Sequence, residues 1–348
     1  MNLTDFRTLG RSGLVVSPLA LGTMTFGKER WGSSEEVSEA VFNAYIDAGG
    51  NFVDTAEAYA DGRSEQMLAG FTQKRSLRDK LVLATKFSFS AEDGNPNAAG
   101  NGRKNMVRAL EGSLKRLGTD YIDLYWMHIW DTVTPVEEVL QSLGDLQRAG
   151  KIRYFGLSDV PAWYAVKMST LASAHTVPGP IALQMEYSLA AREIEREHLP
   201  AARECGLAML PWSPLAGGFL SGKYERGSAG ATGEGRLSGG NPFGDTKFTG
   251  RNWGILDALR SVAADMGRPP AQVALAWAAM QPGITSTIIG ASKPEQLQDN
   301  LASLDIEFTP AQTQALLTAS APEPSFYDYL QSGILSRIVF GTAVQGWQ

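Results

Sequence analysis

Eight short apolar runs recur along the chain, and segments of helical periodicity separate them. Each run is almost continuously apolar, which is typical of strands that are buried on both faces of a parallel sheet. We therefore expect eight strands, at residues 19–24, 51–56, 81–87, 122–128, 152–158, 181–187, 207–213 and 285–291.

The segments between these runs carry start and stop signals for helices. Residues 33–50 begin with Ser, continue with an acidic first turn and end on Gly, and residues 106–118 also end on Gly. Residues 135–151 open with Pro135 and close on Gly150. Eight strand–helix units in this order predict an α/β fold, a (β/α)8 TIM barrel. A doubly wound sheet is the alternative, and it is disfavoured because no G-x-G-x-x-G motif joins a strand to a helix.

We expect the whole chain, 1–348, to form a single domain whose barrel covers residues 19–303. Residues 4–17 predict a β-hairpin around an Arg-Ser-Gly turn, which would plug the bottom of the barrel. Residues 221–251 are rich in glycine and predict a long loop, which we interpret as a functional lid. The remaining features are helical stretches at 252–266 and 270–281, which imply one or two extra helices, and a C-terminal loop at 320–348.

Composition narrows the class of protein. The chain has 348 residues, 43% of them hydrophobic, and a net charge of −6, so it offers no basic footprint for nucleic acid or an anionic membrane. Its single cysteine, Cys205, excludes a disulfide framework and a cysteine-based metal site, and we expect a buried, inert thiol. The N-terminus lacks the features of a signal peptide, and no apolar run reaches the roughly 18 residues of a membrane span. These features predict a cytoplasmic protein.

Polar residues with complementary chemistry stand at the carboxyl ends of the expected strands, where the active sites of such barrels lie. Asp54 ends the second strand and Tyr59 follows in its loop, while Lys86 and His128 end the third and fourth strands. Reduction of a carbonyl places negative charge on its oxygen, which then needs a proton donor within hydrogen-bond distance. The ordinary pKa of tyrosine, about 10, is too high for ready proton donation, and a nearby Lys86 ammonium would lower the pKa of Tyr59. Asp54 would hold Lys86 charged, and His128 would hydrogen-bond the carbonyl oxygen or assist the proton transfer.

Each of these four residues also has a structural interpretation when it is taken alone. Asp54 could cap the segment that follows its strand, and Lys86 could be a solvated cation at a strand end. His128 could be a core histidine between Trp126 and Trp130, and a tyrosine is more often a packing residue than a catalytic one. The arrival of all four types at one end of the barrel favours the catalytic interpretation.

The chain resembles the aldo-keto reductases over nearly its whole length, most of all the branch of aryl-alcohol dehydrogenases and general stress proteins. The motifs that carry the resemblance are LGTMTFG at 21–27, FVDTAEAYADGRSE at 52–65, LATKF at 83–87, SLKRLGTDYIDLYWMH at 113–128, GLSD at 156–159, QMEYS at 184–188, PWSPLAGGFLSGKY at 211–224 and IIGASKPEQLQDNL at 288–301.

The resemblance implies a catalytic tetrad of Asp54, Tyr59, Lys86 and His128, with Tyr59 as the acid in reduction and the base in oxidation. Trp212 would stack on the nicotinamide of the cofactor. The other cofactor contacts that it implies are Ser158 and Gln184 at the carboxamide, the backbone of Thr23 and Met24, Ser213, Pro214, Leu215 and Lys223 along the pyrophosphate, and Gly290, Ser292, Gln296, Asp299 and Asn300 around the adenosine. Substrate walls would come from Phe26, Trp31, Phe89, Trp130 and Tyr187, together with aromatic residues of the tail.

The chain departs from the family pattern at two cofactor positions. Asp159 stands where the family has Asn, so the usual amide contact is in question there. Gln296 stands where some members have an arginine beside the 2′-phosphate, so that Ser292 and Lys293 would have to bind this phosphate. NADPH is the favoured cofactor and NADH a weaker one. Arg236 in the loop at 221–251 is a further candidate phosphate contact.

The sequence thus predicts an NADP(H)-dependent oxidoreductase that acts on a small aldehyde, ketone or alcohol. We expect an aromatic or alicyclic substrate, such as a xenobiotic or a secondary metabolite. One alternative is an NADPH-binding regulatory subunit of the potassium-channel β type, which shares this fold. A metal-dependent barrel hydrolase is a poorer alternative, because the chain has three histidines and no H-x-H pair. We expect no metal site.

Overall fold

The computed structural model describes residues 1–227, 236–237, 247–330 and 333–341 of the chain. Eight parallel strands lie in the order β10-β3-β4-β5-β6-β7-β8-β9. The Thr285 amide donates a hydrogen bond of 2.9 Å to the Met209 carbonyl and links the two outer strands, which brings the sheet close to a closed barrel. The strands are β3 (Leu19–Gly22), β4 (Phe52–Asp54), β5 (Val82–Phe87), β6 (Ile122–Met127), β7 (Ile152–Ser158), β8 (Ala182–Glu186), β9 (Ala208–Trp212) and β10 (Thr287–Gly290). This confirms the predicted (β/α)8 TIM barrel.

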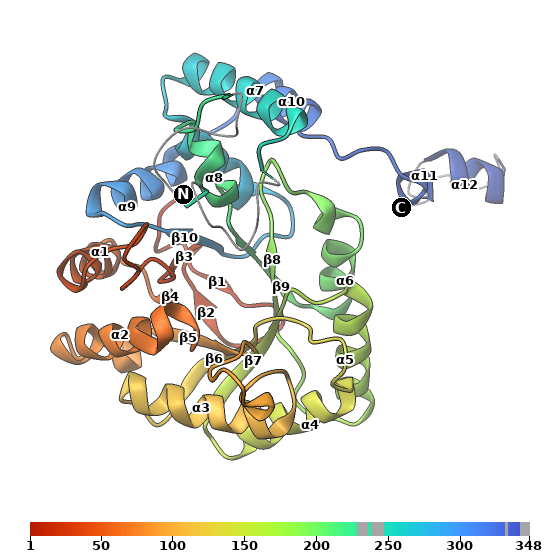
Figure 1. The fold of residues 1–348 in the computed structure, drawn as a ribbon. Coiled ribbons are helices and arrows are strands. Elements are labelled where there is room, and N and C mark those ends of the chain that lie inside the picture. Colours follow the sequence, from red (N-terminus) through yellow and green to blue (C-terminus); the bar gives the residue numbers. More distant parts are fainter. Residues whose placement is uncertain (228–235, 238–246, 331–332, 342–348) are drawn as a thin grey trace.

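Helices surround the sheet (Figure 1). Within the described residues, two helices that pack on the barrel are additional to the eight strand–helix units. The additional helices, α7 (Gly250–Met266) and α10 (Pro310–Ala319), pack on each other, and the Gln312 side chain donates to Asp265 over 2.7 Å. The ring consists of α1 (Glu35–Asp47), α2 (Arg63–Lys74), α3 (Arg103–Leu117), α4 (Val136–Arg148), α5 (Ala162–Ala174), α6 (His198–Cys205), α8 (Pro270–Met280) and α9 (Pro294–Leu301).

The expected start and stop signals act at most of these helices. The Ser34 hydroxyl caps α1 by accepting the Val37 amide, and Gly118 ends α3 in the left-handed conformation that glycine adopts without a steric cost. Pro135 is the N-cap of α4 and not a residue of its first turn. The helix ends at Arg148, and Gly150 turns the chain with a φ of 74°.

The N-terminal hairpin closes one end of the barrel, as predicted. Its strands β1 (Arg7–Thr8) and β2 (Val15–Val16) are antiparallel, and the Arg11 amide donates to the Gly206 carbonyl just before β9 begins. Leu9 and Val16 are fully buried and pack with the side chains that fill the barrel interior, such as Trp126. The hairpin therefore covers the amino ends of the strands, opposite the carboxyl ends.

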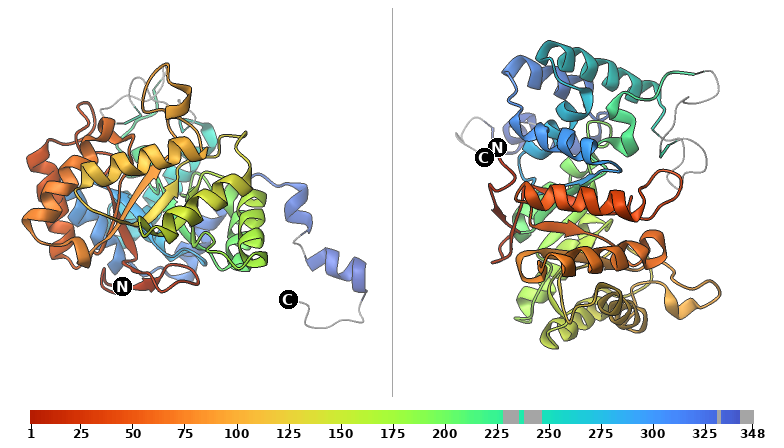
Figure 2. Two further views of the ribbon diagram at one scale, coloured as in Figure 1. Left: turned by 90° about the horizontal axis from the view of Figure 1, so that it is seen from below. Right: turned by 90° about the vertical axis from the view of Figure 1, so that its left-hand side faces the viewer.

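Other segments differ from expectation or lie outside the described residues. The expected C-terminal loop contains two short helices, α11 (Phe326–Leu330) and α12 (Gly333–Phe340), that extend away from the barrel (Figures 1 and 2). Most of the loop at 221–251 lies outside the described residues, so the lid prediction is untested there. Cys205 is only partly buried, packed against the core. Among the described helices, none is long and apolar enough to cross a membrane.

Candidate active site

Four side chains meet at the open end of the barrel because neighbouring parallel strands end side by side. Asp54 is the last residue of β4, Lys86 lies near the end of β5, and His128 directly follows β6. Tyr59 begins the 3-10 turn η1 (Tyr59–Gly62) after β4. The structure thus brings together all four residues that the sequence predicts as a tetrad.

Lys86 is the centre of this group. Its ammonium is buried and donates hydrogen bonds to the Asp54 carboxylate, to the Thr55 carbonyl at 2.8 Å and to the Tyr59 hydroxyl at 3.2 Å. Burial alone would lower the pKa of Lys86, but the neighbouring Asp54 carboxylate and Tyr59 oxygen together raise it. Lys86 is therefore a fixed cation beside the Tyr59 oxygen at neutral pH.

The pKa of Tyr59 differs from the sequence-based expectation. Burial raises the pKa of this phenol, and the Lys86 charge lowers it by less, so that the net direction is upward from the ordinary value. Lys86 acts in the predicted direction, but desolvation by the closed barrel is the larger effect. Tyr59 is accordingly a protonated hydroxyl at neutral pH, which suits a proton donor.

His128 is a neutral imidazole. Burial and the nearby Lys86 charge hold the pKa of His128 well below its usual range. Its ring centroid lies 5.9 Å from that of Tyr59, edge to face, and 4.3 Å from that of Phe89. A cavity of 250 Å³ lies beside Lys86 and His128, with Phe89 in its lining. His128 can therefore donate to or accept from a ligand without carrying a charge.

Two ion pairs that the sequence analysis did not single out border this cavity. Arg108 of α3 pairs with Glu57 at 2.7 Å, and Arg116 pairs with the buried Glu65 at 2.6 Å. The repeated arginine on α3 and the two glutamates that flank Tyr59 are visible in the sequence, but nothing in their spacing indicates which pairs form. These pairs fix α3 against the segment that carries Tyr59.

The residues expected at the nicotinamide lie on the next strands. The Ser158 hydroxyl is buried at the end of β7 and has no hydrogen-bond partner within the described residues. The side-chain amide N–H of Gln184 on β8 donates to the second Asp54 oxygen over 3.1 Å, so this amide contacts a residue of the tetrad. Trp212 ends β9, and its indole N–H donates to the Asp159 carboxylate over 2.9 Å. Asp159 therefore makes an acceptor contact that its family counterpart, an amide, could also make.

The turn after β9 has a distinctive backbone. Ser213 has a φ of 53°, Gly217 and Gly218 have φ values of 68° and 92°, and the Ser213 hydroxyl accepts the Gly217 amide at 2.8 Å. Pro214 and Leu215 complete this turn, and the exposed Lys223 follows it, with its ammonium 5.2 Å from the Tyr224 ring. A tight turn of this kind with a lysine beside it suits an anionic group.

The residues expected around the adenosine form a second cluster, at the carboxyl end of β10. The Ser292 amide and hydroxyl both donate to the Gln296 side-chain oxygen, at 2.9 and 3.0 Å, and Asn300 donates to the Gly290 carbonyl at 3.0 Å. Asp299 is exposed on α9 and accepts a 3.5 Å hydrogen bond from Gln272. Lys293 is the N-cap of α9, and its side chain makes no capping hydrogen bond within the described part of the chain.

The loop after β3 connects both clusters. The Thr23 amide donates to the Asp54 carbonyl at 2.9 Å, and the Thr25 hydroxyl donates to the Ala291 carbonyl, also at 2.9 Å. The partly exposed Met24 lies between these two anchors. One segment thus spans the distance from the tetrad to the start of α9.

The expected substrate residues fall into two groups. Phe89 is exposed beside His128, the partly exposed Trp130 packs edge to face on Trp163 at 5.7 Å, and Arg236 lies over the Trp31 ring at 5.5 Å. Two others are buried and do not line the cavity, and their place in a substrate wall stays a prediction. Phe26 is fully buried against Phe71, and Tyr187 is buried against Trp277 with its hydroxyl on Glu195 at 2.6 Å.

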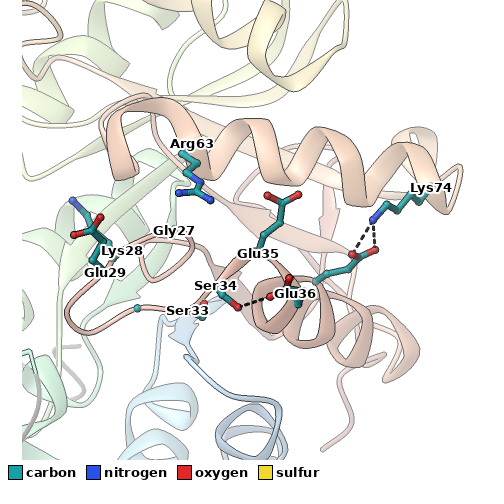
Figure 3. A pocket seen from close by; sticks show the side chains of 11 residues that line it. Gly27, Lys28, Glu29, Ser33, Ser34, Glu35, Glu36, Arg63 and Lys74 are labelled. Carbon is teal, nitrogen blue, oxygen red and sulfur yellow. Dashed lines mark hydrogen bonds and ion pairs between the residues drawn. The ribbon is translucent and has the colours of Figure 1, made fainter.

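A larger hollow of 790 Å³ lies on the outside of the barrel, between the loop after β3 and α2 (Figure 3). Its lining is mainly charged, and it holds the exposed Lys74–Glu39 ion pair but no residue of the tetrad. In the described part of the chain, no group of three or more histidine, cysteine or carboxylate side chains is placed to hold a metal ion.

Comparisons with known proteins agree with this geometry. A model described as the Aldo/keto reductase family matches residues 18–320. The chain is 36% identical to "Uncharacterized oxidoreductase YrpG" of Bacillus subtilis (87% of this chain, 91% of that protein). It is 32% identical to "Aryl-alcohol dehydrogenase [NADP(+)]" of Phanerodontia chrysosporium (92% and 86%), and 35% identical to "Probable voltage-gated potassium channel subunit beta" of Oryza sativa (87% and 92%).

Proposed function

Because the chain belongs to the aldo/keto reductase family, we propose that it is an oxidoreductase that interconverts a carbonyl compound and an alcohol with NADP(H). The observation that carries this proposal is the buried group of Asp54, Lys86 and Tyr59 at the open end of the barrel. Few other roles account for a lysine that is sealed from water and points its charge at a tyrosine hydroxyl.

Each residue of the tetrad has a different role in the proposed reaction. The cofactor supplies or accepts the hydride, and the protein supplies orientation and electrostatics. In reduction Tyr59 donates its proton to the substrate oxygen as negative charge develops there, and the Lys86 ammonium at 3.2 Å stabilises the phenolate that is left. Asp54 holds Lys86 in place, and the neutral His128 donates a hydrogen bond to the same substrate oxygen. In oxidation the Tyr59 phenolate takes the proton back.

The residues at the mouth fit a nicotinamide cofactor. The unpartnered Ser158 hydroxyl offers a donor and an acceptor to a carboxamide, and the Trp212 ring offers a stacking surface beside it. The turn after Ser213 and the Lys223 ammonium suit a pyrophosphate, and the amino end of α9 suits the adenosine side. These groups follow one another along the rim from β7 to β10, the order that an extended dinucleotide requires.

We further propose an aromatic or alicyclic substrate, such as a xenobiotic or a secondary metabolite. Phe89 presents an exposed ring directly beside His128 and lines the cavity of 250 Å³ there. Trp130 and Trp31 offer further partly exposed aromatic surface.

The test is a panel of aldehydes, ketones and alcohols, including 4-nitrobenzaldehyde, with absorbance of the reduced nicotinamide as the readout. We expect turnover of aromatic members with NADPH. The resemblance to a protein named as a potassium-channel β subunit makes a regulatory role the second candidate. Tight NADPH binding without turnover of any compound in the panel would favour that role.

Cofactor choice gives a separate prediction. A 2′-phosphate beside α9 would gain the positive end of the helix dipole, the Ser292 hydroxyl and the exposed Lys293 charge. One net charge-assisted hydrogen bond, about 1.5–3 kcal/mol, corresponds to a preference for NADPH over NADH of roughly tenfold to a hundredfold. Because Ser292 already donates to Gln296, we expect the lower end of this range.

Replacing Ser292 and Lys293 together by Ala should remove most of this preference and leave NADH affinity nearly constant. Titration of both cofactors by tryptophan quenching measures it, with Asp120→Asn, at an exposed position before β6, as a charge-changing control away from α9. Equal affinity of the unchanged protein for NADH and NADPH would contradict the assignment of this end of α9 to the phosphate.

A further inference from the structure

The contact between Asp159 and Trp212 brings a carboxylate to the edge of an aromatic ring at the barrel mouth. The indole N–H of Trp212 donates to the Asp159 Oδ1 over 2.9 Å. Asp159 directly follows β7 and Trp212 ends β9, so the bond spans the intervening strand β8. It fixes the plane of the indole from the side, because a ring held by its N–H cannot turn about its Cβ without losing the bond.

The backbone holds Asp159 in place for this contact. Its φ is 46°, in the left-handed region that few residues other than glycine enter, although Asp and Asn tolerate it. Its amide donates to the Gln184 carbonyl at 3.2 Å, and its carbonyl accepts the Trp130 amide at 3.3 Å. Both backbone groups are therefore satisfied, which fixes the backbone of Asp159, and the Trp212 hydrogen bond orients its carboxylate.

The charge of Asp159 is not neutralised locally. Within the described residues no Lys or Arg forms an ion pair with it. Glu186, the residue opposite Trp212 on β8, is by contrast paired with Lys247. The Lys86 cation, which acts on Asp159 electrostatically, is itself paired with Asp54. A ring stacked on the Trp212 indole would thus lie close to a carboxylate that has no direct ion-pair partner within the described residues.

We propose that Asp159, held against the Trp212 indole, makes the site prefer the oxidised cofactor to the reduced one. This inference rests on the proposed function, in which Trp212 stacks on the nicotinamide. The nicotinamide ring is a cation in NADP+ and is neutral in NADPH. A carboxylate at the edge of the stacked pair attracts only the cation, and it also makes the indole more electron-rich, which strengthens the stacking of a cationic ring. Asp159 acts through Trp212 and is a positioning residue.

The proposal predicts a dependence on pH. Burial, together with the Glu186 charge, raises the pKa of Asp159 to about 6, against the Trp212 hydrogen bond and the Lys86 charge, which lower it. Above this pKa the carboxylate is ionised and the preference for NADP+ is present. Below it the group is neutral and the preference is lost. The phosphates of the two cofactors are the same, so their own titration cancels in a ratio of dissociation constants.

Isothermal titration calorimetry of NADP+ and NADPH, from about pH 5.5 to about pH 8, tests the proposal. We expect the ratio Kd(NADPH)/Kd(NADP+) of the unchanged protein to rise about tenfold across this range. Asp159→Asn keeps an acceptor for the indole and removes the charge, so its ratio should stay at the low value at every pH. Asp120→Asn, the same change at an exposed position before β6 at the plugged end of the barrel, should behave like the unchanged protein.

The outcomes distinguish failure of this inference from failure of the proposed function. A flat ratio in the unchanged protein overturns the inference without any variant. An Asp159→Asn protein that keeps the rise, or that binds both cofactors more weakly by the same factor, overturns it as well, because the residue would then have only a structural role. Failure of the unchanged protein to bind either cofactor would overturn the proposed function itself.

Discussion

Replacing Tyr59 by Phe is expected to reduce turnover by roughly a hundredfold to ten-thousandfold. The change removes one oxygen and little volume, so the packing of η1 and the cofactor residues should be preserved. What is lost is the proton donor at 3.2 Å from the Lys86 ammonium. The Kd for NADPH should change little, because Tyr59 is assigned to the substrate oxygen and not to the cofactor. Single-turnover mixing, which isolates the chemical step, measures the effect.

Tyr154→Phe is the matched control, since this tyrosine lies on β7 against the plug side of the barrel interior, away from the mouth. It should retain the turnover of the unchanged protein. A Tyr59→Phe protein that keeps a tenth or more of the single-turnover rate would refute the role of Tyr59 as the acid and base.

The sequence predicted the strands well because the barrel leaves a strong signal. Strands buried on both faces must be continuously apolar, and the eight runs match the eight strands with shifts of one or two residues at their ends. The tetrad could be predicted for a related reason. Parallel strands end at the same edge, so polar residues at the ends of consecutive strands must meet.

The parts that could not be predicted depend on packing in three dimensions. Phe26 and Tyr187 have the same residue types and the same positions after strands as a substrate wall, but they turn into the core. The direction of the Tyr59 pKa depends on whether desolvation or the Lys86 charge is larger, and that balance requires the burial of the folded chain. The Ser292–Gln296 and Asp159–Trp212 contacts are likewise side-chain geometries that a sequence does not specify.

The second large effect is expected at Lys86. In Lys86→Met the Asp54 carboxylate stays buried without its partner, and breaking a buried pair in this way costs about 3–5 kcal/mol of stability. Turnover should fall by roughly a hundredfold or more, because the phenolate of Tyr59 loses the cation that stabilises it. Urea unfolding and single-turnover kinetics measure the two effects separately.

The pH profile distinguishes an electrostatic role of Lys86 from a structural one. The Lys86 charge lowers the pKa of Tyr59 against the larger effect of burial. Removing this cation therefore raises the pKa of Tyr59 further. Alcohol oxidation needs the Tyr59 phenolate as base, so the ascending limb of its profile, where activity rises with pH, follows the ionisation of Tyr59 and should move to higher pH in Lys86→Met.

The double variant Asp54→Asn with Lys86→Met separates this shift from loss of stability. It removes the unpaired carboxylate together with the cation, so most of the lost stability should return, since no buried charge remains without a partner. The limb should still lie at a higher pH than in the unchanged protein. The shift should be smaller than in the single variant, because Asp54 itself raises the pKa of Tyr59. A double variant that is stable, active and unmoved in its pH profile would show that Lys86 only supports the fold, and the proton transfer would then need another source of electrostatic stabilisation.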